Sequence, residues 1–460
     1  MSEVRDQDQG GDLMSASMTQ TKTSKGGHSC PPNVGLENPP SGWEISPIGD
    51  LVTLRTKQRN PERDPEKRFF YVDVSSVSNT SFRITAPTEL PGAEAPSRAR
   101  KVIQAGDVLF ATVRPTLKRV ALVPDDLHDQ IASTGFIVLR SDALRLDSRY
   151  LYYRLLTDAF TQRMSELERG ASYPAVRDSD ILNEKIALPP LPEQRKIAGV
   201  LGLVQRAMEQ QERLIALVTE LKKALLHKLF TEGLRGESQK QTEIGPVPES
   251  WEQRPLEKAG EVVYGIQAAV ASNLKPVGTM ILTNKNITLD GKIILEKINY
   301  FELKTKRHHE TVLQKGDLLF NWRSGSKEHV GKTAYFDLAG EFVHSSFILR
   351  IRPSDEVTGR YLFYYLNFLR ESGFFLKKQT FSVNAKFNKS AINELPTYLP
   401  GEEERREVVD ALDAVGKKLD TLHSKKRLIE DLFRTLLHQL MTAQIRVKRL
   451  DIEELKAGIS

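Results

Sequence analysis

The sequence lacks the features that mark extracellular, membrane-spanning or metal-clustered proteins. It has one cysteine, Cys30, which excludes an internal disulfide framework and a cysteine-based zinc cluster. No apolar run approaches the roughly 18–20 residues that span a bilayer. The first residues are polar and include Asp6, Asp8 and Asp12, unlike a signal or transit peptide. We therefore expect a protein of the reducing cytoplasm, with no contact with a membrane.

Motifs for catalysis are also missing. Asn38-Pro39-Pro40-Ser41 has serine where the Asn-Pro-Pro motif of adenine methyltransferases has an aromatic residue that stacks on the flipped base. No glycine-rich cofactor loop follows a strand pattern. The pair His308 and His309 has no third ligand at metal spacing. We expect no catalytic residue, no metal and no cofactor.

A second near-match to a motif lies at Gly325–Thr333. It has five residues between its two glycines, whereas a phosphate-binding loop has four, and a strand pattern follows it where a helix is required. We therefore expect no nucleotide-binding site here, and we take Lys327 and Lys332 as candidates for contacts with the phosphates of a larger partner.

Size and charge leave several classes open. A chain of 460 residues predicts two to three domains. The net charge of +6 fits a polyanionic partner but does not establish one, because many basic proteins bind no nucleic acid. The position of the charges is therefore more informative than their sum.

The chain is internally duplicated. Leu-Leu-His-Lys-Leu-Phe-Thr at 225–231 returns as Leu-Leu-His-Gln-Leu-Met-Thr at 436–442, and positions 225 and 436 differ by 211. The same offset relates 149–153 to 360–364, while 106–110 and 316–320 differ by 210. Small drifts in offset indicate short loop insertions with the order of elements preserved. We predict two copies of one structural unit.

Each copy begins with an α/β globular part, at roughly 41–190 and 249–400. Runs of β-branched and aromatic residues broken by Gly, Pro, Asn and Asp predict strands. A helix is expected near Ser148–Glu168, and its counterpart near Gly359–Glu371. The expected strands are Phe69–Val74, Val108–Val113, Arg119–Val123 and Phe136–Arg140, then Met280–Thr283, Asp317–Trp322, Thr333–Phe336 and Phe347–Ile351.

A long helix ends each copy. Pro189, Pro190 and Pro192 close the first globular part, Glu193 favours a helix start, and the helix should stop near Thr231. Apolar residues at alternating spacings of four and three predict a coiled-coil seam. The seam residues are Ile197, Leu201, Val204, Met208, Ile215, Val218, Leu225 and Leu229 in the first helix, and Val408, Leu412, Val415, Leu419, Leu422, Ile429, Phe433, Leu436 and Leu440 in the second.

An alternative is that each helix packs only on its own domain. Helices of about 36 residues are long for that role, since globular helices average about 11–12 residues. We expect the two seams, which include polar layers, to pair antiparallel. The predicted fold is α+β, with two similar α/β domains separated by two long antiparallel helices that form a coiled coil with pseudo-two-fold symmetry.

Two similar recognition domains held at a fixed distance suit duplex DNA, because one face of the duplex recurs every turn of about 34–36 Å. Basic and aromatic residues lie in the predicted loops of both copies, although solvated loops on a basic protein would look the same. The candidate DNA contacts are Arg55, Lys57, Arg59, Arg83, Arg114, Lys118, Tyr173, Tyr264, Gln267, Asn286, Trp322, Arg323, Lys327, Gln379 and Asn384.

The stretch from Ile186 to Ile197, which contains Pro-Leu-Pro-Glu193-Gln194, resembles the type I restriction-modification specificity subunits. The paired Gly-Asp-Val/Leu-Leu-Phe strands and Ile244–Trp251 strengthen the resemblance, which covers about 40–445. The second copy departs from it, with Pro400–Arg405 in place of Pro-Leu-Pro-Glu-Gln.

The resemblance implies a non-catalytic DNA-specificity subunit. Each domain would recognise one half of a bipartite duplex site, and the helices would set the spacer and bind the modification (methyltransferase) subunits, two in number. The same partners and the restriction/translocase subunits would carry out methylation and ATP-dependent cleavage. Two other interpretations stay open at this point: a coiled-coil scaffold whose two domains bind proteins, and the recognition part of a fused methyltransferase.

The expected organisation follows the repeat. A flexible tail at 1–38 precedes a target-recognition domain at 39–190 and a first coiled-coil helix at 191–234. A linker and second target-recognition domain occupy 235–400, a second helix 401–445 and a C-terminal tail 446–460.

Overall fold

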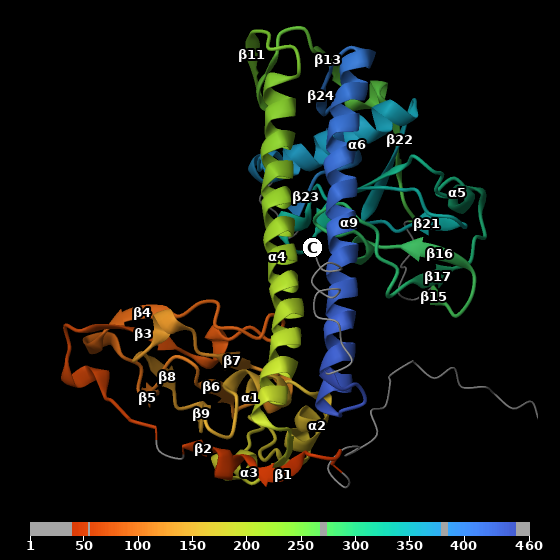
Figure 1. The fold of residues 1–460 in the computed structure, drawn as a ribbon. Helices are drawn as coiled ribbons and strands as arrows, with labels where there is room; N and C mark the ends of the chain where they lie inside the picture. The colour runs from red at the N-terminus through yellow and green to blue at the C-terminus, as the bar shows by residue number, and fades with distance from the viewer. Residues whose placement is uncertain (1–38, 54–55, 267–273, 379–384, 448–460) are drawn as a thin grey trace, which may run out of the picture. The chain divides into compact units, whose positions relative to one another are not determined.

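The structure, a computed structural model, describes residues 39–53, 56–266, 274–378 and 385–447. It divides into two compact units, Met1–Gln205 with Leu432–Ser460, and Arg206–Asp431. The division falls inside both long helices, α4 (Leu191–Glu232) and α9 (Glu402–Met441), so each unit is considered by itself (Figure 1). The expected tail at 1–38 and residues 448–460 of the expected C-terminal tail lie outside the described residues.

The first unit contains the globular part that we call the first head, from β1 to β10. Its helices are short, and its strands have two to six residues. The elements are β1 (Glu44–Pro47), β2 (Val52–Thr53), β3 (Arg68–Val72), β4 (Thr88–Pro91), β5 (Ala99–Val102), β6 (Val108–Ala111), β7 (Val120–Leu122), β8 (Ile131–Ser133), β9 (Phe136–Ser141), α1 (Ser148–Leu155), α2 (Asp158–Leu167), α3 (Asp178–Leu182) and β10 (Lys185–Leu188).

Two four-stranded sheets form the first head. One has the order β2-β9-β6-β7 and is antiparallel, and the other has the order β4-β3-β8-β5 with β3 and β8 parallel. All four residues of β6 are buried, as expected for a central strand with apolar side chains on both faces. A core cluster joins the two sheets and includes Val72 from β3, Leu109 from β6 and Phe136 from β9.

The second unit contains the second head, from β13 to β24, preceded by a β11–β12 hairpin. The elements are β11 (Gln239–Thr242), β12 (Gly245–Pro248), β13 (Glu252–Pro255), β14 (Gly260–Tyr264), β15 (Leu274–Lys275), β16 (Thr279–Leu282), β17 (Asn299–Phe301), α5 (Lys306–His309), β18 (Leu318–Asn321), β19 (Arg323–Ser324), β20 (Thr333–Tyr335), β21 (Phe342–His344), β22 (Ile348–Pro353), α6 (Glu356–Glu371), α7 (Phe374–Lys378), β23 (Ala385–Lys386), α8 (Lys389–Asn393) and β24 (Pro396–Leu399).

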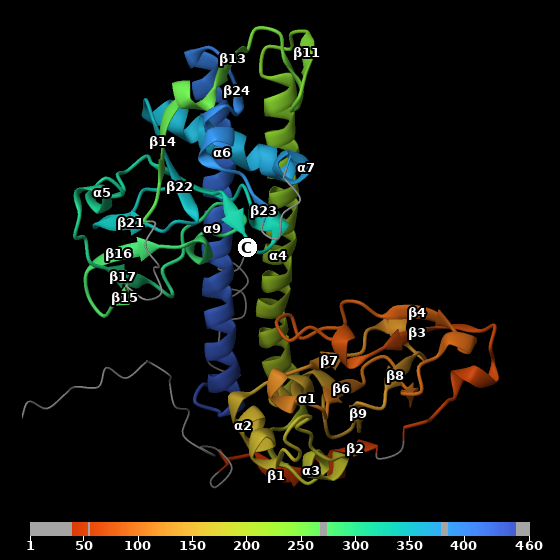
Figure 2. The ribbon, with the colours of Figure 1, turned by 180° about the vertical axis from the view of Figure 1, so that it is seen from behind.

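The second head repeats the sheets of the first, with one difference. The order β14-β22-β18-β20 corresponds strand for strand to β2-β9-β6-β7. The parallel pair β16–β21, with β17 beside β16, corresponds to β3–β8 with β4 (Figure 2). The fourth strand differs: β5 pairs with β8 in the first head, whereas in the second head the residues at the same offset form the isolated bridge Val312–Val343 to β21, and a different strand, β15, pairs with β17. The duplication is therefore structural, and the heads diverge at a sheet edge.

The predicted strands all appear, with ends shifted by a few residues, and one predicted helix is wrong. Instead of one helix over 148–168, the first head has α1 and α2, because Thr157 is extended and its hydroxyl accepts a hydrogen bond from the Phe160 amide. That side chain caps a new helix and ends the old one. The counterpart α6 in the second head is continuous over 16 residues.

The long helices begin within one residue of the expected positions, and α9 ends at Met441, four residues before the expected 445. α4 has 42 residues, ends at Glu232 and is followed by Gly233 at φ +65°. Such a left-handed glycine commonly terminates a helix. α9 has 40 residues, and both helices carry glutamates in the first turn, where carboxylates interact favourably with the helix dipole.

Within the second unit, α4 and α9 run antiparallel. Glu212 pairs with Lys426 at 3.0 Å near one end, and the amide of Leu234, just past α4, donates to Glu404 at 2.8 Å at the other end. A polar layer lies between them, where the buried Gln211 side chain donates to the Leu422 carbonyl at 2.7 Å. One buried polar group of this kind fixes the register of a coiled coil.

All of the predicted seam residues are buried or half-buried. Those in the first unit, Ile197, Leu201, Val204, Phe433, Leu436 and Leu440, are buried. Those in the second unit are buried at Met208, Leu229, Val408, Leu412, Leu422 and Ile429, and half-buried at Ile215, Val218, Leu225, Val415 and Leu419.

Each unit ties the start of one long helix to the end of the other. In the first unit, Glu193 accepts from the Trp43 indole at 3.3 Å and from Arg446 at 2.9 Å. In the second, Glu404 accepts from the Trp251 indole at 3.4 Å and from the Leu234 amide at 2.8 Å. The repeated tryptophan and glutamate therefore serve the same purpose in both copies.

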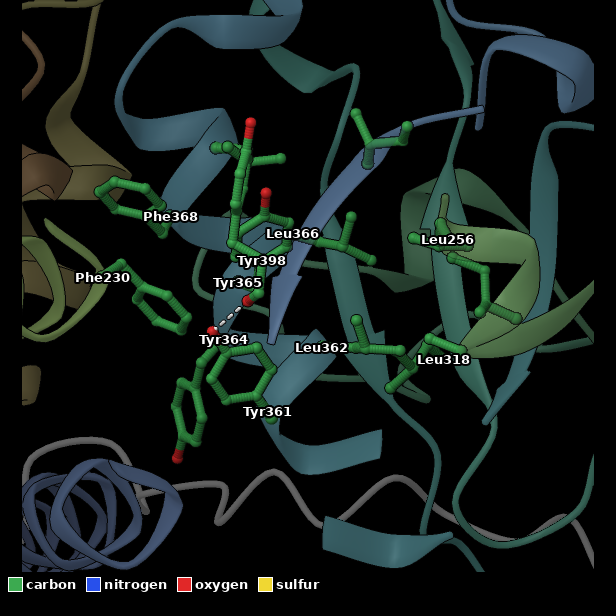
Figure 3. Close-up of a cluster of buried hydrophobic side chains, with 14 of the residues drawn as sticks. Phe230, Leu256, Leu318, Tyr361, Leu362, Tyr364, Tyr365, Leu366, Phe368 and Tyr398 are labelled. Carbon is green, nitrogen blue, oxygen red and sulfur yellow. Dashed lines mark hydrogen bonds between the residues drawn. The ribbon is translucent and has the colours of Figure 1, made fainter. Parts of the chain in front are cut away.

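Aromatic side chains dominate the core of the second unit. Phe230, in the last turn of α4, is fully buried and stacks on Phe368 at 5.2 Å with an interplanar angle of 18° (Figure 3). Tyr361 and Tyr365 of α6 lie 5.2 and 5.6 Å from the same ring. The hydroxyl of Tyr361 donates to the Tyr398 carbonyl at 2.7 Å, which satisfies the one polar atom of that buried ring.

Candidate nucleic-acid interface

The first head presents an arginine stacked on an exposed tyrosine. The guanidinium of Arg114 lies 5.6 Å from the ring centroid of Tyr173, whose side chain is 74% exposed. Arg114 has a left-handed backbone with φ +50°, and its amide donates to the Pro174 carbonyl at 2.7 Å. A residue other than glycine in this conformation is strained, and such strain concentrates at functional sites.

The second head has a similar pair. The guanidinium of Arg323 lies 5.1 Å from the ring centroid of Phe347, which is 37% exposed. The neighbouring Trp322 donates from its indole to the Ser346 carbonyl at 2.8 Å, and its ring meets Tyr264 edge to face at 5.4 Å. These contacts hold the loop that carries Arg323 in a defined place.

Both arginines lie just past the same repeated strand, at adjacent positions of the repeat. β6 and β18 are equivalent central strands, and Arg114 and Arg323 follow them by three and two residues. The backbone just after β6 forms a bridge from Val113 to Ala175, and the backbone after β18 pairs Arg323 with Lys386. At the offset of 210, Arg323 corresponds to Val113 and not to Arg114, and the ring beside each arginine comes from a different loop.

The remaining predicted contacts in the first head fall into two groups. Lys57 is exposed, and Arg59 and Arg83 are half-buried, with Arg59 donating to the Asp129 carbonyl at 3.3 Å. Lys118 is engaged internally, since its ammonium donates to the Leu156 carbonyl at 3.2 Å and pairs with Asp158. That lysine joins α1 to α2, so it is the weakest of the four as a DNA contact.

Two expectations for the second head need correction. Asn286 is 3% exposed, and its amide caps its own turn and donates to the Ile294 carbonyl, so it is a structural residue and not a contact. Lys332 is 5% exposed and donates to the carbonyls of Asn284 and Ile287. Burial lowers the pKa of Lys332, and this lysine does not reach a phosphate. Lys327, by contrast, is exposed.

Four predicted contacts, Arg55, Gln267, Gln379 and Asn384, lie outside the described residues. One residue of the arrangement was missed in the sequence: Phe347, whose ring stacks on Arg323. Its counterpart by offset, Phe136, is fully buried at the start of β9. Nothing in the two matching sequences distinguishes an exposed ring from a buried one.

The second unit also has a cavity of about 990 Å³ between α4, α6, α7 and α9. Several of its charged side chains are already paired, Lys292 with Asp420 and Arg360 with Asp413. Apolar side chains such as Leu226, Val330 and Phe375 form much of the remaining lining.

Other kinds of site find no support in the part of the chain that the structure describes. Within residues 39–53, 56–266, 274–378 and 385–447, no group of three or more His, Cys, Asp or Glu side chains could hold a metal ion. Over the same residues, none of the helices is both long and apolar enough to cross a membrane. His344 is buried, and burial lowers its pKa to about 4, so the ring is neutral.

Two heads with corresponding sheets, an arginine–aromatic pair just past the central strand of each, and two long helices that contribute to both units define a duplicated α+β protein. The sequence matches the model of the family described as Type I restriction modification DNA specificity domain, at residues 40–220 and again at 248–431. The chain therefore belongs to the type I restriction-modification specificity family.

Known proteins agree with this assignment. The chain is 25% identical over 436 residues to the type I restriction enzyme MjaVIII specificity subunit of Methanocaldococcus jannaschii, covering 90% of this chain and 95% of that protein. It is 29% identical, with a TM-score of 0.57, to a solved chain from work on complex assembly and conformational transition of the type I R-M system, covering 87% and 98% of the two chains. The S subunit from M. genitalium, at 15% identity, a TM-score of 0.54 and 86% and 96% coverage, shows the same fold.

Specificity subunits are the recognition components of type I enzymes and not their catalytic ones. This agrees with the expectation that the chain has no catalytic residue. The family, the fold class and the non-catalytic character predicted from the sequence are confirmed by these comparisons.

Proposed function

We propose that the chain recognises a bipartite DNA site, with each head contacting one half of it. The observation that carries the proposal is an arginine–aromatic pair just past the end of the central strand of each head. Arginine is the side chain best suited to both base edges and phosphates, and a ring beneath it fixes its orientation. The net charge of +6 favours a polyanionic partner.

The differences between the heads support two different half-sites. The fourth strand of one sheet attaches at β8 in the first head and at β17 in the second. The ring under the arginine is Tyr173 in one head and Phe347 in the other. Identical heads would recognise identical half-sites, so divergence at sheet edges and loops on a repeated framework suits recognition of two unlike sequences.

The long helices are proposed to set the spacer between the half-sites and to bind the modification subunits. Leu217 on α4 and Leu428 on α9 are 67% and 70% exposed, and they are related by the repeat offset of 211. Leu221 and Leu432 form the next pair at that offset, 56% and 36% exposed. Large exposed apolar side chains repeated at equivalent positions suit two copies of one partner. Restriction/translocase subunits would complete the assembly.

DNA binding is tested with the chain co-purified with its modification subunits. We expect fluorescence anisotropy to show binding to a duplex that carries the methylated site, with affinity falling at least about 10³-fold between 50 and 200 mM salt, because phosphate contacts release counterions. A duplex with both half-sites scrambled is the control. Salt-independent binding, or none with the partners still attached, would instead support the protein-interaction scaffold.

Partner docking is tested by placing a charge on the equivalent leucines. We expect Leu217→Asp combined with Leu428→Asp to abolish co-purification of the modification subunits, because a buried carboxylate in an apolar contact is strongly unfavourable. The matched control is Gln210→Asp with Thr421→Asp, which adds the same charge at exposed positions that are also 211 apart. Retention of both partners by the leucine variant would contradict docking at this surface.

A further inference from the structure

We propose that Arg114 and Arg323 each contact a guanine, so that both halves of the recognised site contain a G·C pair whose identity depends on one arginine. This inference rests on the proposed function and goes beyond it, because it names the base and the residue in each head. The arginines of the heads differ in the groups that their guanidinium groups already contact.

Most of the arginines near the sheets have structural partners. Arg140 and Arg352 each make two hydrogen bonds of 2.7–2.8 Å to the buried carboxylates of Asp107 and Asp317. Arg119 donates to backbone carbonyls, among them that of Val74 at 3.0 Å. These guanidinium groups already use their donors within the protein and have little capacity left for DNA.

Arg114 and Arg323 are different. Among the residues that the structure describes, no carboxylate pairs with either guanidinium, and each instead lies over an aromatic ring. A cation–π contact with a ring uses none of the hydrogen-bond donors of the guanidinium. The ring therefore reduces the freedom of a long side chain without consuming its hydrogen-bond donors.

The backbone restrains the same two residues. Arg114 is held in a left-handed conformation between β6 and a short turn, with its amide bonded to the Pro174 carbonyl. Arg323 belongs to β19, which pairs with β23, and it follows Trp322, whose indole is anchored to the Ser346 carbonyl. Each arginine is thus fixed both at its Cα and at its guanidinium, which is the preorganisation that base recognition requires.

A fixed guanidinium edge has one preferred base. Guanine presents O6 and N7 as two adjacent acceptors in the major groove, and arginine pairs with both at once. Adenine has a donor beside N7, and the pyrimidines lack the paired acceptors. Lysine carries the same charge but no fork of donors, so it cannot replace arginine in this contact.

The experiment uses the complex of the chain with its modification subunits. Mapping the methylated sites in cells that carry the wild-type complex gives both half-sites, and we expect a guanine in each. In the purified complex, Arg114→Ala and Arg114→Lys should each weaken binding to the matched site by about 5- to 150-fold. The two Arg114 variants should lose the preference for guanine at one position of one half-site. Arg323→Ala and Arg323→Lys should lose it at one position of the other half-site.

Three controls separate base contact from other effects. Arg63→Ala and Arg307→Ala each remove an exposed arginine that makes no cation–π contact with a ring among the described residues. Selectivity should stay unchanged in both variants. Tyr173→Phe keeps the ring under Arg114 and should keep selectivity, whereas Tyr173→Ala should lose part of it. Replacing the guanine by 7-deazaguanine removes N7, and it should weaken the wild-type complex but not the Arg114→Ala variant.

Half-sites without guanine would overturn the inference. So would an equal loss of affinity for matched and mismatched duplexes, which would assign the arginines to phosphates. In both cases salt-dependent binding to the mapped site would persist, so the proposed function would stand while this inference fell. Loss of all DNA binding by the wild-type complex would instead remove the proposed function itself.

Discussion

Replacing Phe230 with alanine should lower the free energy of unfolding of the second unit by about 3–5 kcal/mol, the usual cost of truncating a buried phenylalanine. Its ring is fully buried against Phe368, Tyr361, Tyr365 and Trp251, with centroid distances of 5.2 to 6.5 Å. Removing it leaves a cavity among rigid rings that cannot collapse to fill the space. Urea unfolding followed by tryptophan fluorescence in a Trp43→Phe background measures the effect, because Trp251 and Trp322 then report on the second unit alone.

The repeat supplies the control for this change. Position 441, which corresponds to Phe230 by the offset of 211, is occupied by the buried Met441. Phe230→Met should therefore cost less than about 1.5 kcal/mol, because methionine fills much of the same volume and adapts its shape. A loss below about 1 kcal/mol for Phe230→Ala would show that the last turn of α4 does not contribute to this core.

The long helices and the repeated strands could be predicted because their signals are local and periodic. Spacings of four and three identified seam residues that are all at least half-buried, and Gly233 marked the end of α4 at a left-handed backbone position. A side chain on the apolar face of a helix is buried as soon as that helix pairs with another, independently of the rest of the fold. Because the chain is duplicated, this pattern of apolar spacings occurs twice.

Features that depend on tertiary packing could not be predicted. Asn286 and Lys332 have the composition of exposed loop residues, yet both are buried and bonded to backbone carbonyls. Thr157 breaks a helix whose counterpart α6 continues, because its side chain caps the next helix. The different attachment of β5 and β15 likewise depends on long-range pairing, for which a single sequence offers no local signal.

The structure gives Gln194, in the Pro-Leu-Pro-Glu-Gln motif, a structural role. Gln194 is fully buried, donates to the carbonyls of Arg145 and Pro189 at 2.9 and 2.8 Å, and accepts from the Asp147 amide at 2.9 Å. It thereby joins the start of α4 to the start of α1. The second copy has Arg405 at this position, so the junction is built differently there although Glu404 keeps the contact with Trp251.

The aspartates of the two Gly-Asp-Val/Leu-Leu-Phe strands form the other repeated junction. Asp317 is 1% exposed, accepts two hydrogen bonds from Arg352 at 2.7 and 2.8 Å, and accepts a third from the Gln314 amide at 2.7 Å. Asp107 makes the same three bonds to Arg140 and the Gln104 amide. The sequence motif therefore marks a buried carboxylate that joins a turn to the neighbouring strand.

We expect Asp317→Ala to destabilise the second unit by about 3 kcal/mol, because it leaves a partly buried guanidinium and a turn amide without their acceptor. Arg352→Ala should cost a similar amount, and the double variant should cost less than the sum of the two. Urea unfolding in the Trp43→Phe background measures all three. Glu302→Ala, which removes an exposed ion pair with Lys304, should change stability by less than about 1 kcal/mol.

The duplication turns this measurement into a test of the architecture. Asp107→Ala should destabilise the first unit by a similar amount, since the two carboxylates have the same partners and the same burial. Trp43 fluorescence in a Trp251→Phe, Trp322→Phe background reports that change. If the stability losses of the single variants simply added up in the double variant of both units, the aspartate and arginine would not be coupled. The aspartate of the motif would then stabilise only the turn amide. Coupling in both units would show that both copies kept the same carboxylate–guanidinium junction.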